Sequence, residues 1–583
     1  MALLRSRSLA SAITLGFVLS TGALACGAAD DEVDDGSAES AYTEGSLEAR
    51  AILALVNDPV TNSERLLGDV KVATRASANI LAHRDGGDGK AGTRDDDRFD
   101  TLKELDDISF VGPATLKSLY EYAKSHGYGG AAGRSVDVVF SPQAIENSHL
   151  AKVASVIDGA QKSVDILMYS YSASQISEAI KRAIARGVKV RFVFETAGED
   201  KSLTGDALAR SKSGQLEAMG VDVRYVNKIM HHKVLIVDGP RDDVKLAATA
   251  RITTGSANWS SGAATSYDEN TLVFTGYPEL ALELQRDFNL LWDHSKDFVS
   301  GAAKPADPSK LTILDSTIPE DPNVDAFFTS ANFDVTDTTF RGNGKNTISD
   351  ALILAIQNAK KSIHVASGHL RHRAVAEALI AKAKASPNVD IKVYLDAQEY
   401  VSEASNTFQE KELATCLAGA TTPAQTRTCT DKGFLYGYEV GNSNIDVRYK
   451  FYSYRWDNSY AKQMHDKYFV FDGETLYSGS YNLSDNAEHD TFENMLVFRG
   501  AEHAALVKAY EANFASIREI GRSSFSELQN EIKTADPLPI VFDSVALDWD
   551  EVTALKTLIR ANCSAIDTQV FRTAAAQHQT CKR

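Results

Sequence analysis

The chain has 583 residues, with 61 basic and 79 acidic side chains and a formal net charge of −18. This length exceeds what one hydrophobic core usually supports, so we expect two or three domains. The excess of acidic side chains repels nucleic-acid backbones and anionic lipid surfaces at long range, which argues against binding to either through general surface charge. An anionic substrate must therefore be captured by a local basic pocket.

The first 25 residues have the pattern of an export signal. Arg5 and Arg7 precede an apolar or small run over residues 9–25, which ends in Ala23-Leu24-Ala25 directly before Cys26. We therefore expect a secreted or periplasmic protein. Cleavage by ordinary signal peptidase and lipid attachment through Cys26 both remain open, because a cysteine at this place resembles a bacterial lipoprotein junction. No later run reaches the roughly 18 apolar residues of a membrane-spanning helix, so we expect no transmembrane segment in the mature protein.

Two segments lie between this signal and the main part of the chain. Residues 26–45 are rich in Asp, Glu, Gly, Ser and Ala, which predicts a disordered linker. Residues 46–132 predict a small helical domain, in which Val111-Gly112-Pro113-Ala114 separates two short helices. This unit resembles a helix-hairpin-helix, which holds nucleic-acid phosphates in other proteins, but its acidic surroundings favour a hairpin used for packing. Residues 85–97 could wrap a calcium ion, although a solvated acidic loop is the favoured interpretation.

From about residue 135 onward, short strands alternate with amphipathic helices, which is typical of layered α/β domains. The same order occurs twice: we expect strand, helix and strand at residues 166–171, 176–186 and 188–194, and again at 363–367, 374–385 and 391–395. An internal duplication explains this repetition better than coincidence.

Each half carries the same set of polar residues. The first half has His231-His232-Lys233, Asp238, Gly255-Ser256-Ala257-Asn258 and Glu269-Asn270, and the second has His465-Asp466-Lys467, Asp472, Gly479-Ser480-Tyr481-Asn482 and Glu493-Asn494. The step from the last asparagine of the Gly-Ser-x-Asn segment to the glutamate is 11 residues in both halves. A single His-x-Lys-x4-Asp match arises by chance in roughly one chain in twenty, whereas two matches with the same followers do not.

The spacing of these residues predicts a phosphate-binding pocket. Side chains alternate along a strand, so the histidine and lysine of each motif point to one face, and two such strands side by side bring both pairs together. Glu269 and Glu493 are the candidates for orienting the imidazoles. Asp238 and Asp472 complete the motifs and join the candidate catalytic set, although their place after four largely apolar residues favours a role at a strand end. We expect purely structural roles for five other histidines: His232, His364, His369, His372 and His489.

Four cysteines follow Cys26. Export would place them where disulfides persist, and nearest-neighbour pairing joins Cys416 to Cys429 and Cys563 to Cys581. The two other pairings remain open. Metal binding is the weaker alternative, because neither pair has short spacing or a nearby histidine.

The paired motifs resemble the phospholipase D superfamily over roughly residues 135–520. The resemblance implies two duplicated α-β-α sandwich domains, at residues 135–300 and 325–522. Residues 537–583 lie outside the family pattern, and we expect a helical tail there. No metal or cofactor is implied.

The resemblance also implies a mechanism. His231 attacks phosphorus to give a phosphohistidine, and His465 protonates the leaving alkoxide, although the symmetry of the sequence permits the reverse. The groups that hold the nonbridging oxygens would be Lys233, Lys467, Ser256, Asn258, Ser480 and Asn482.

Three functions fit this pattern. A phospholipase D acting on glycerophospholipids is favoured by the export signal, the potential tether and the acidic surface. A secreted, metal-independent endonuclease is the alternative, and the hairpin-like unit motivates it. A transferase such as a cardiolipin synthase ranks third because membrane-spanning segments are lacking in the sequence.

Overall fold

The computed structural model describes Tyr42, Glu44 and residues 47–58, 61–91, 93, 95–125, 134–397, 412–431, 433–452, 462–534 and 543–561. The expected signal peptide, Cys26 and the Cys563–Cys581 pair lie outside these residues. Cys416 and Cys429 form the predicted disulfide. Across these ranges, no helix combines the length and the apolar character needed to cross a membrane.

A small helical unit with its own apolar core precedes the main part of the chain. Its helices are α1 (Leu47–Val56), η1 (Arg65–Asp69), α2 (Thr74–Arg84), η2 (Gly86–Asp88), α3 (Leu102–Asp106) and α4 (Pro113–Ser125). The predicted hairpin joins α3 to α4 through Phe110, whose φ is 70°. A second turn of this kind was not foreseen: Lys71, with a φ of 64°, lies three residues before α2, just as Phe110 lies three residues before α4.

The acidic loop between α2 and α3 uses its carboxylates internally. The side chain of Asp95 accepts hydrogen bonds from the amide of Asp88 at 3.1 Å and from Oγ1 of Thr93 at 2.7 Å. Asp96 also accepts a hydrogen bond from the Thr93 amide, at 3.1 Å. These bonds favour the interpretation as a solvated, self-bonded loop.

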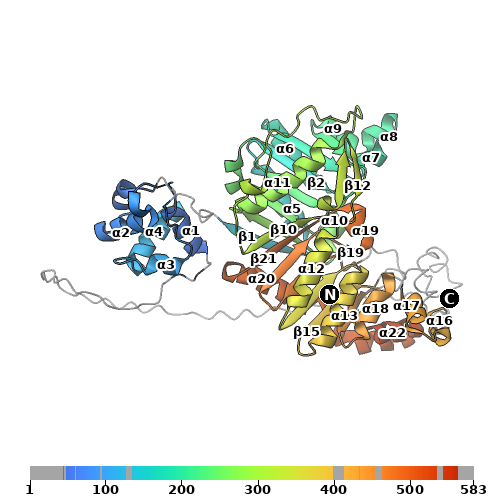
Figure 1. Ribbon diagram of the computed structural model, residues 1–583. Coiled ribbons are helices and arrows are strands. Elements are labelled where there is room, and N and C mark those ends of the chain that lie inside the picture. Colours follow the sequence, from blue (N-terminus) through green and yellow to red (C-terminus); the bar gives the residue numbers. More distant parts are fainter. Residues whose placement is uncertain are drawn as a thin grey trace, which may run out of the picture. The chain divides into compact units, whose positions relative to one another are not determined.

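The main part of the chain, drawn in Figure 1, is built on two sheets, and each sheet has eight strands in a matching order. The first runs β1-β8-β7-β6-β2-β3-β4-β9 and the second β10-β21-β18-β17-β13-β15-β16-β22. In each sheet three neighbouring strands are parallel, β2-β3-β4 in the first and β13-β15-β16 in the second, and antiparallel strands flank them. The predicted duplication and α/β fold class are confirmed.

The strands have the following bounds. The first sheet contains β1 (Ser135–Ser141), β2 (Ser163–Met168), β3 (Lys189–Phe194), β4 (Asp222–Tyr225), β6 (Lys233–Val237), β7 (Arg251–Gly255), β8 (Glu269–Thr275) and β9 (Lys296–Asp297). The second contains β10 (Val324–Phe328), β13 (Ser362–Ser367), β15 (Asp390–Asp396), β16 (Asp446–Phe451), β17 (Lys467–Phe471), β18 (Thr475–Gly479), β21 (Asn494–Arg499) and β22 (Val545–Leu547). Short pairs are β5 (Ile229–Met230) with β20 (Thr491–Phe492), β11 (Phe333–Thr336) with β12 (Thr339–Gly342), and β14 (Leu370–Arg371) with β19 (Leu483–Ser484).

Helices cover the sheets, which explains why central strands such as β2 are buried along their whole length. The main covering helices are α5 (His149–Asp158), α6 (Ser174–Ala185) and α11 (Pro278–Asp293) in the first half, and α12 (Thr347–Asn358), α13 (Arg373–Ala385) and α20 (Ala504–Ile517) in the second. Each half has its own core, built partly from α5 and α6 or from α12 and α13. A third core joins residues of both halves, including Phe288 of α11 and Phe514 of α20, so the halves pack together.

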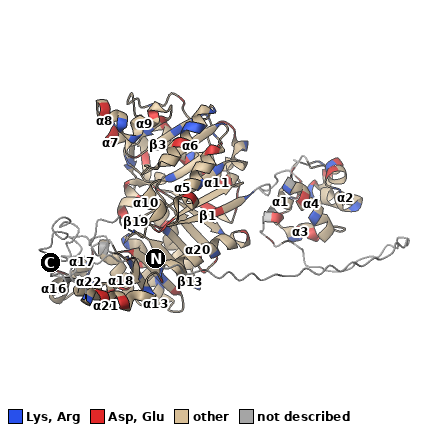
Figure 2. Ribbon diagram, turned by 180° about the vertical axis from the view of Figure 1, so that it is seen from behind, with Lys and Arg blue, Asp and Glu red and all other residues tan. Residues whose placement is uncertain are grey.

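Smaller helices decorate this framework. They are α7 (Ala197–Asp200), α8 (Gly205–Arg210), α9 (Lys212–Ala218), α10 (Ser261–Thr265), α16 (Leu413–Gly419), α17 (Pro423–Thr430), α18 (Tyr436–Gly441), α19 (Asp485–His489), α21 (Phe525–Thr534) and α22 (Trp549–Ala561). Acidic residues lie on helices such as α8 and α21, with basic residues among them (Figure 2).

The C-terminal tail differs from the helical tail expected from the sequence. The part that the structure describes, residues 543–561, contains β22, which pairs antiparallel with β16 and takes the edge position that β9 takes in the first sheet. Only then does helix α22 follow. Three strand residues are too few for alternation to reveal a strand in the sequence.

The sheets bring both lysine-bearing strands to corresponding edges. Lys233 lies opposite Met168, the last residue of β2, and Lys467 lies opposite Ser367, the last residue of β13. These are the carboxyl ends of the parallel central strands, where α/β proteins commonly bind ligands.

Candidate active site

Both motif histidines are hydrogen-bonded to a glutamate of the other half. Nδ1 of His231 lies 2.9 Å from Oε2 of Glu493, and Nδ1 of His465 lies 2.8 Å from Oε1 of Glu269. The glutamate side chains are 1% and 0% exposed. A carboxylate at Nδ1 favours the tautomer with a lone pair on Nε2. The two predicted glutamates therefore contact the imidazoles, and each pair crosses between the halves.

Short backbone pairings make this exchange possible. β5, directly before His231, pairs in parallel with β20, and Met464 forms a bridge with Asp268. The amide of His231 donates to the carbonyl of Phe492 at 3.1 Å, and that of His465 donates to the carbonyl of Asp268 at 2.9 Å. The sequence suggested that the two histidine segments lie side by side, and the structure shows that they do not. Each lies beside the glutamate-bearing segment of the opposite half.

The motif lysines are buried beside their own histidines. Nζ of Lys233 donates to the carbonyl of His231 at 2.6 Å, and Nζ of Lys467 donates to that of His465 at 2.6 Å. Burial lowers the pKa of Lys233 to about 7, although the carboxylate of Glu493 acts in the opposite direction. Burial also lowers the pKa of Lys467. The pKa of each lysine is therefore sensitive to a nearby anion, which would raise it.

The ionisable groups of the two halves share one electrostatic environment. Burial lowers the pKa of His231 well below its usual value, and the charges of Lys233, Lys467 and His465 lower it further. Burial and both lysines have the same effect on the pKa of His465. These effects favour the neutral form of both imidazoles. Burial raises the pKa values of Glu269 and Glu493 to about 7, against the pull of the lysines.

The two motif serines bond to the glutamate-bearing segments of their own halves. Oγ of Ser480 donates to Oε2 of Glu493 at 2.6 Å. Oγ of Ser256 donates to the carbonyl of Asn270, the residue after Glu269, at 3.4 Å and accepts a hydrogen bond from the Asn270 amide at 2.9 Å. Both serines are 0% exposed. Both hydroxyls therefore turn toward the glutamate-bearing segments, and the contact of Ser256 and Ser480 with substrate stays a prediction.

The motif asparagines remain candidates for substrate contact. Asn258 and Asn482 are half-buried, and among the described residues neither side-chain oxygen has a hydrogen-bond partner. The carbonyl of Asn258 receives a hydrogen bond from Nε2 of the buried His149 at 2.9 Å, which fixes that turn. The turn that carries Asn258 is thus fixed, and both side-chain oxygens retain hydrogen-bonding capacity.

The motif aspartates lie far from the histidines. The carboxylate of Asp238 accepts amide hydrogen bonds from residues 161–163, and that of Asp472 accepts them from residues 360–362. Each aspartate is seven residues beyond its histidine, which is about 20 Å along an extended strand. Their inclusion in the catalytic set is therefore corrected, and they join strand ends as their apolar neighbours suggested.

Two tyrosines near the histidines were not identified from the sequence. The ring of Tyr169 is 4.7 Å from that of His231, and Nζ of Lys233 lies 5.2 Å from the Tyr169 ring centroid. The ring of Tyr267 is 6.1 Å from that of His465. By strand register, the counterpart of Tyr169 in the second half is Gly368, so the two sides of the site differ.

The five histidines expected to be structural fall into two groups. His232, His364 and His372 contact acidic residues, respectively Asp287 at 3.1 Å, Glu511 at 2.6 Å and Asp485 at 3.6 Å. His489 lies in the short helix α19. His369 differs, because its charge helps to lower the pKa of His465 and it therefore lies near the site.

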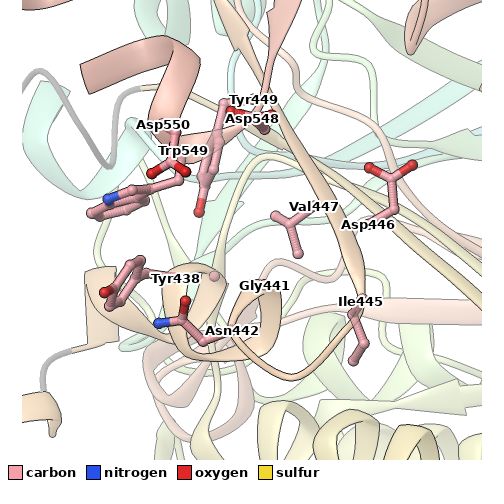
Figure 3. Close-up of a pocket in the computed structure, with 11 residues that line it drawn as sticks. Tyr438, Gly441, Asn442, Ile445, Asp446, Val447, Tyr449, Asp548, Trp549 and Asp550 are labelled. Atoms are coloured by element: carbon pink, nitrogen blue, oxygen red, sulfur yellow. The ribbon is translucent and has the colours of Figure 1, made fainter. Parts of the chain in front are cut away.

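A separate cavity of about 300 Å³ lies at the start of β16 (Figure 3). Tyr438, Asn442, Val447 and Trp549 are among the residues that line it. The parallel strands β15 and β16 begin at this edge and end at the opposite one, where His465 lies. The cavity is thus distinct from the histidine site.

The fold and the site define a class of duplicated α/β proteins in which a histidine-lysine motif from each half contributes to one site. A family model described as "Cardiolipin synthase, PLD-like domain" matches residues 153–292 and 352–518, which make up more than half of the 583 residues. The chain belongs to the phospholipase D superfamily.

Curated relatives resemble part of this chain. The mitochondrial cardiolipin hydrolase of Danio rerio is 31% identical over 157 residues, which cover 26% of this chain and 61% of that protein. The Homo sapiens protein of the same name is 29% identical over 148 residues, covering 25% and 52%. This chain thus spans between half and two thirds of the length of these relatives. A solved structure of a phospholipase D family member, Nuc from Salmonella typhimurium, is 31% identical, with 28% of this chain and 97% of that chain covered and a TM-score of 0.23.

Proposed function

We propose that the chain is an exported phosphodiesterase of the phospholipase D type, which hydrolyses glycerophospholipids to phosphatidate and a free head group. The exchange of His–Glu pairs between the halves carries this proposal. It places two imidazoles and two buried lysines in one electrostatic environment. A two-step displacement at phosphorus requires these groups to be close together.

In the first step, Nε2 of His231 attacks phosphorus. An N–P bond forms, the P–O bond to the head group breaks, and Nε2 of His465 gives its proton to the departing alkoxide. In the second step, water gives a proton to His465 and attacks phosphorus. The N–P bond then breaks, which releases phosphatidate and restores His231.

The nonbridging oxygens gain negative charge in both transition states. Lys233 and Lys467 neutralise this charge, and the side-chain amides of Asn258 and Asn482 donate hydrogen bonds to it. Because these groups are held by the fold before substrate arrives, little reorganisation accompanies the reaction.

Substrate binding also favours the uptake of a proton from solvent by His465. With both lysines charged, both glutamates ionised and both imidazoles neutral, the six groups have no net charge. A bound phosphodiester adds one negative charge, which raises the pKa of His465 and favours uptake of a proton. The charge of the substrate thereby favours the charged form of the general acid.

Glycerophospholipid is the favoured substrate for two reasons. The net charge of −18 opposes the capture of a long polyanion, and the expected export signal directs the protein toward an envelope or membrane surface. The names of the curated relatives add cardiolipin to the phospholipids that merit testing. We propose a secreted or cell-envelope location, which cell fractionation and mass spectrometry of the mature N-terminus would test.

A direct assay compares lipid and DNA. Purified protein is incubated with vesicles of phosphatidylcholine, phosphatidylethanolamine or cardiolipin, and separately with plasmid DNA, with and without a chelator. We expect release of head group from lipid and no effect of the chelator, because lysines supply the positive charge. Rapid DNA cleavage without lipid turnover would instead favour the endonuclease.

A further inference from the structure

Two acidic residues occupy corresponding places in the two halves. In the first sheet, Phe194 of β3 lies opposite Met168, which in turn lies opposite Lys233. In the second sheet, Leu395, Ser367 and Lys467 form the same row. The next residue of the chain is Glu195, directly after β3, in the first sheet and Asp396, the last residue of β15, in the second. The duplication has thus kept a carboxylate at this position on both sides.

Both carboxylates bind the backbone directly ahead of a motif histidine. Oε2 of Glu195 accepts the amide of Met230 at 2.5 Å, and Oδ2 of Asp396 accepts the amide of Met464 at 2.7 Å. Met230 and Met464 are 0% and 1% exposed, so these amides have no access to bulk solvent. A buried amide that loses its acceptor costs about 1–3 kcal/mol, which makes each bond a constraint on the chain.

These bonds add a second constraint on the backbone at each motif histidine. The histidine's own amide donates to a carbonyl of the opposite half, which leaves the preceding amide as the remaining donor in the dipeptide. The methionine amide is held by its own half and the histidine amide by the other half. Two consecutive peptide groups are thus fixed from opposite directions, and this sets where the imidazole projects.

We propose that Glu195 and Asp396 are positioning residues, each of which holds the main chain ahead of one motif histidine, and that Glu195 also sets the charge beside Lys233. This inference rests on the proposed function, because it concerns the placement of the two histidines for attack and protonation. Neither carboxylate needs to touch the substrate.

The two carboxylates differ in their surroundings. Asp396 is 1% exposed and also accepts a hydrogen bond from the Tyr452 hydroxyl at 3.1 Å. Glu195 is half-buried, and the charged or titratable groups that face it are Lys233, Tyr169 and Glu199. Its negative charge raises the pKa of Lys233, as do the charges of Glu493 and Glu269. The charge of Lys467 lowers it. Removing the Glu195 charge should therefore lower the pKa of Lys233.

Substitutions separate the two roles of Glu195. In Glu195→Ala the Met230 amide loses its acceptor, so we expect kcat to fall about 10- to 100-fold with little change in KM. Glu195→Gln keeps an acceptor oxygen and should restore most of kcat. Because it lacks the charge, its alkaline limb of kcat/KM should move to lower pH by about half a unit or more. Asp396→Ala and Asp396→Asn repeat the positioning test on the other histidine.

Glu217 offers a matched control. Its half-buried carboxylate accepts the amide of Val223 at 2.9 Å, which is the same kind of bond on α9 and β4. Glu217→Ala should leave kcat and the pH profile unchanged. Hydrolysis of bis(4-nitrophenyl) phosphate by the full chain provides the rates, and thermal unfolding provides the folding control. Should an alanine variant fail to fold, Glu195→Asp and Asp396→Glu, which move the carboxylate by one methylene, serve the same test.

The outcomes distinguish the two proposals. A wild-type protein that cleaves neither this diester nor phospholipid defeats the proposed function. An active wild type whose Glu195 and Asp396 variants match Glu217→Ala overturns the positioning role. An unshifted alkaline limb in Glu195→Gln overturns the role of its charge.

Discussion

His231 and Glu493 are 262 positions apart in the sequence, yet Nδ1 of the imidazole lies 2.9 Å from Oε2 of the carboxylate. The reciprocal pair, His465 and Glu269, shows the same exchange. Neither half alone can orient its own histidine. The duplicated chain therefore depends on contact between its halves for a complete site.

The exchanged pairs predict that each glutamate supports the histidine of the other half. Glu493→Gln and Glu269→Gln weaken the bond that fixes the imidazole tautomer, so we expect kcat to fall about 10- to 100-fold in each. Diester hydrolysis and thermal unfolding are measured together. Glu283→Gln, which removes a carboxylate paired with Arg286 on α11, serves as control and should retain full activity. Wild-type rates in both glutamate variants would remove these residues from the mechanism.

Removal of the proposed nucleophile should have a much larger effect. In His231→Ala we expect turnover to fall by about three orders of magnitude or more, while folding is nearly unchanged. His489→Ala, in the short helix α19, is the matched substitution and should remain active. A fully active His231→Ala protein would show that another group attacks phosphorus.

The buried lysines predict the alkaline side of the pH profile. Because the pKa of Lys233 is about 7 in the free protein, kcat/KM should decline above about pH 7 as this ammonium loses its proton. A bound phosphodiester stabilises the charged lysine, so the corresponding limb of kcat should lie at higher pH. Initial rates across pH 5–10 at low and saturating substrate give both limbs. Coincident limbs would mean that substrate does not raise the pKa of this lysine.

The motif aspartates predict a loss of stability rather than of catalysis. Burial acts to raise the pKa of Asp238, but the amides of residues 161–163 outweigh it and the pKa is lowered. The stabilising bonds are therefore present at neutral pH and lost as the pH falls through the folded-state pKa. We expect Asp238→Ala to lower the free energy of unfolding by about 2 kcal/mol at pH 7. This deficit should shrink in acid, with KM unchanged, and denaturant titrations at pH 7 and pH 3 measure it.

The sequence predicted the duplication because each half repeats whole motifs. His231, Lys233, Glu269 and their counterparts were found from identity and spacing alone. Alternation placed His231 and Lys233 on one face of a single strand, whereas β6 begins at Lys233. Local patterns of this kind are visible in a single sequence because neighbouring residues carry them.

Other features could not be predicted because they depend on contacts between distant segments. Spacing alone could not show that Ser480 turns toward Glu493, since a serine beside a phosphate and a serine beside a carboxylate occupy the same motif position. The place of Glu195 becomes visible only when β3 is aligned with β15 through the strand register. Aligning the two halves on their motifs could have drawn attention to Tyr169, because Gly368 stands opposite it.

The most direct test of the proposed mechanism is detection of a covalent intermediate. In His465→Ala the general acid is absent, but 4-nitrophenolate leaves without protonation, so the first step can proceed while hydrolysis by activated water is slowed. The protein is mixed with bis(4-nitrophenyl) phosphate, quenched in base and analysed by peptide mass spectrometry. We expect a 4-nitrophenyl phosphate group on His231 and none in the His231→Ala, His465→Ala double variant. Nitrophenolate release without modification of either histidine would contradict covalent catalysis at this site.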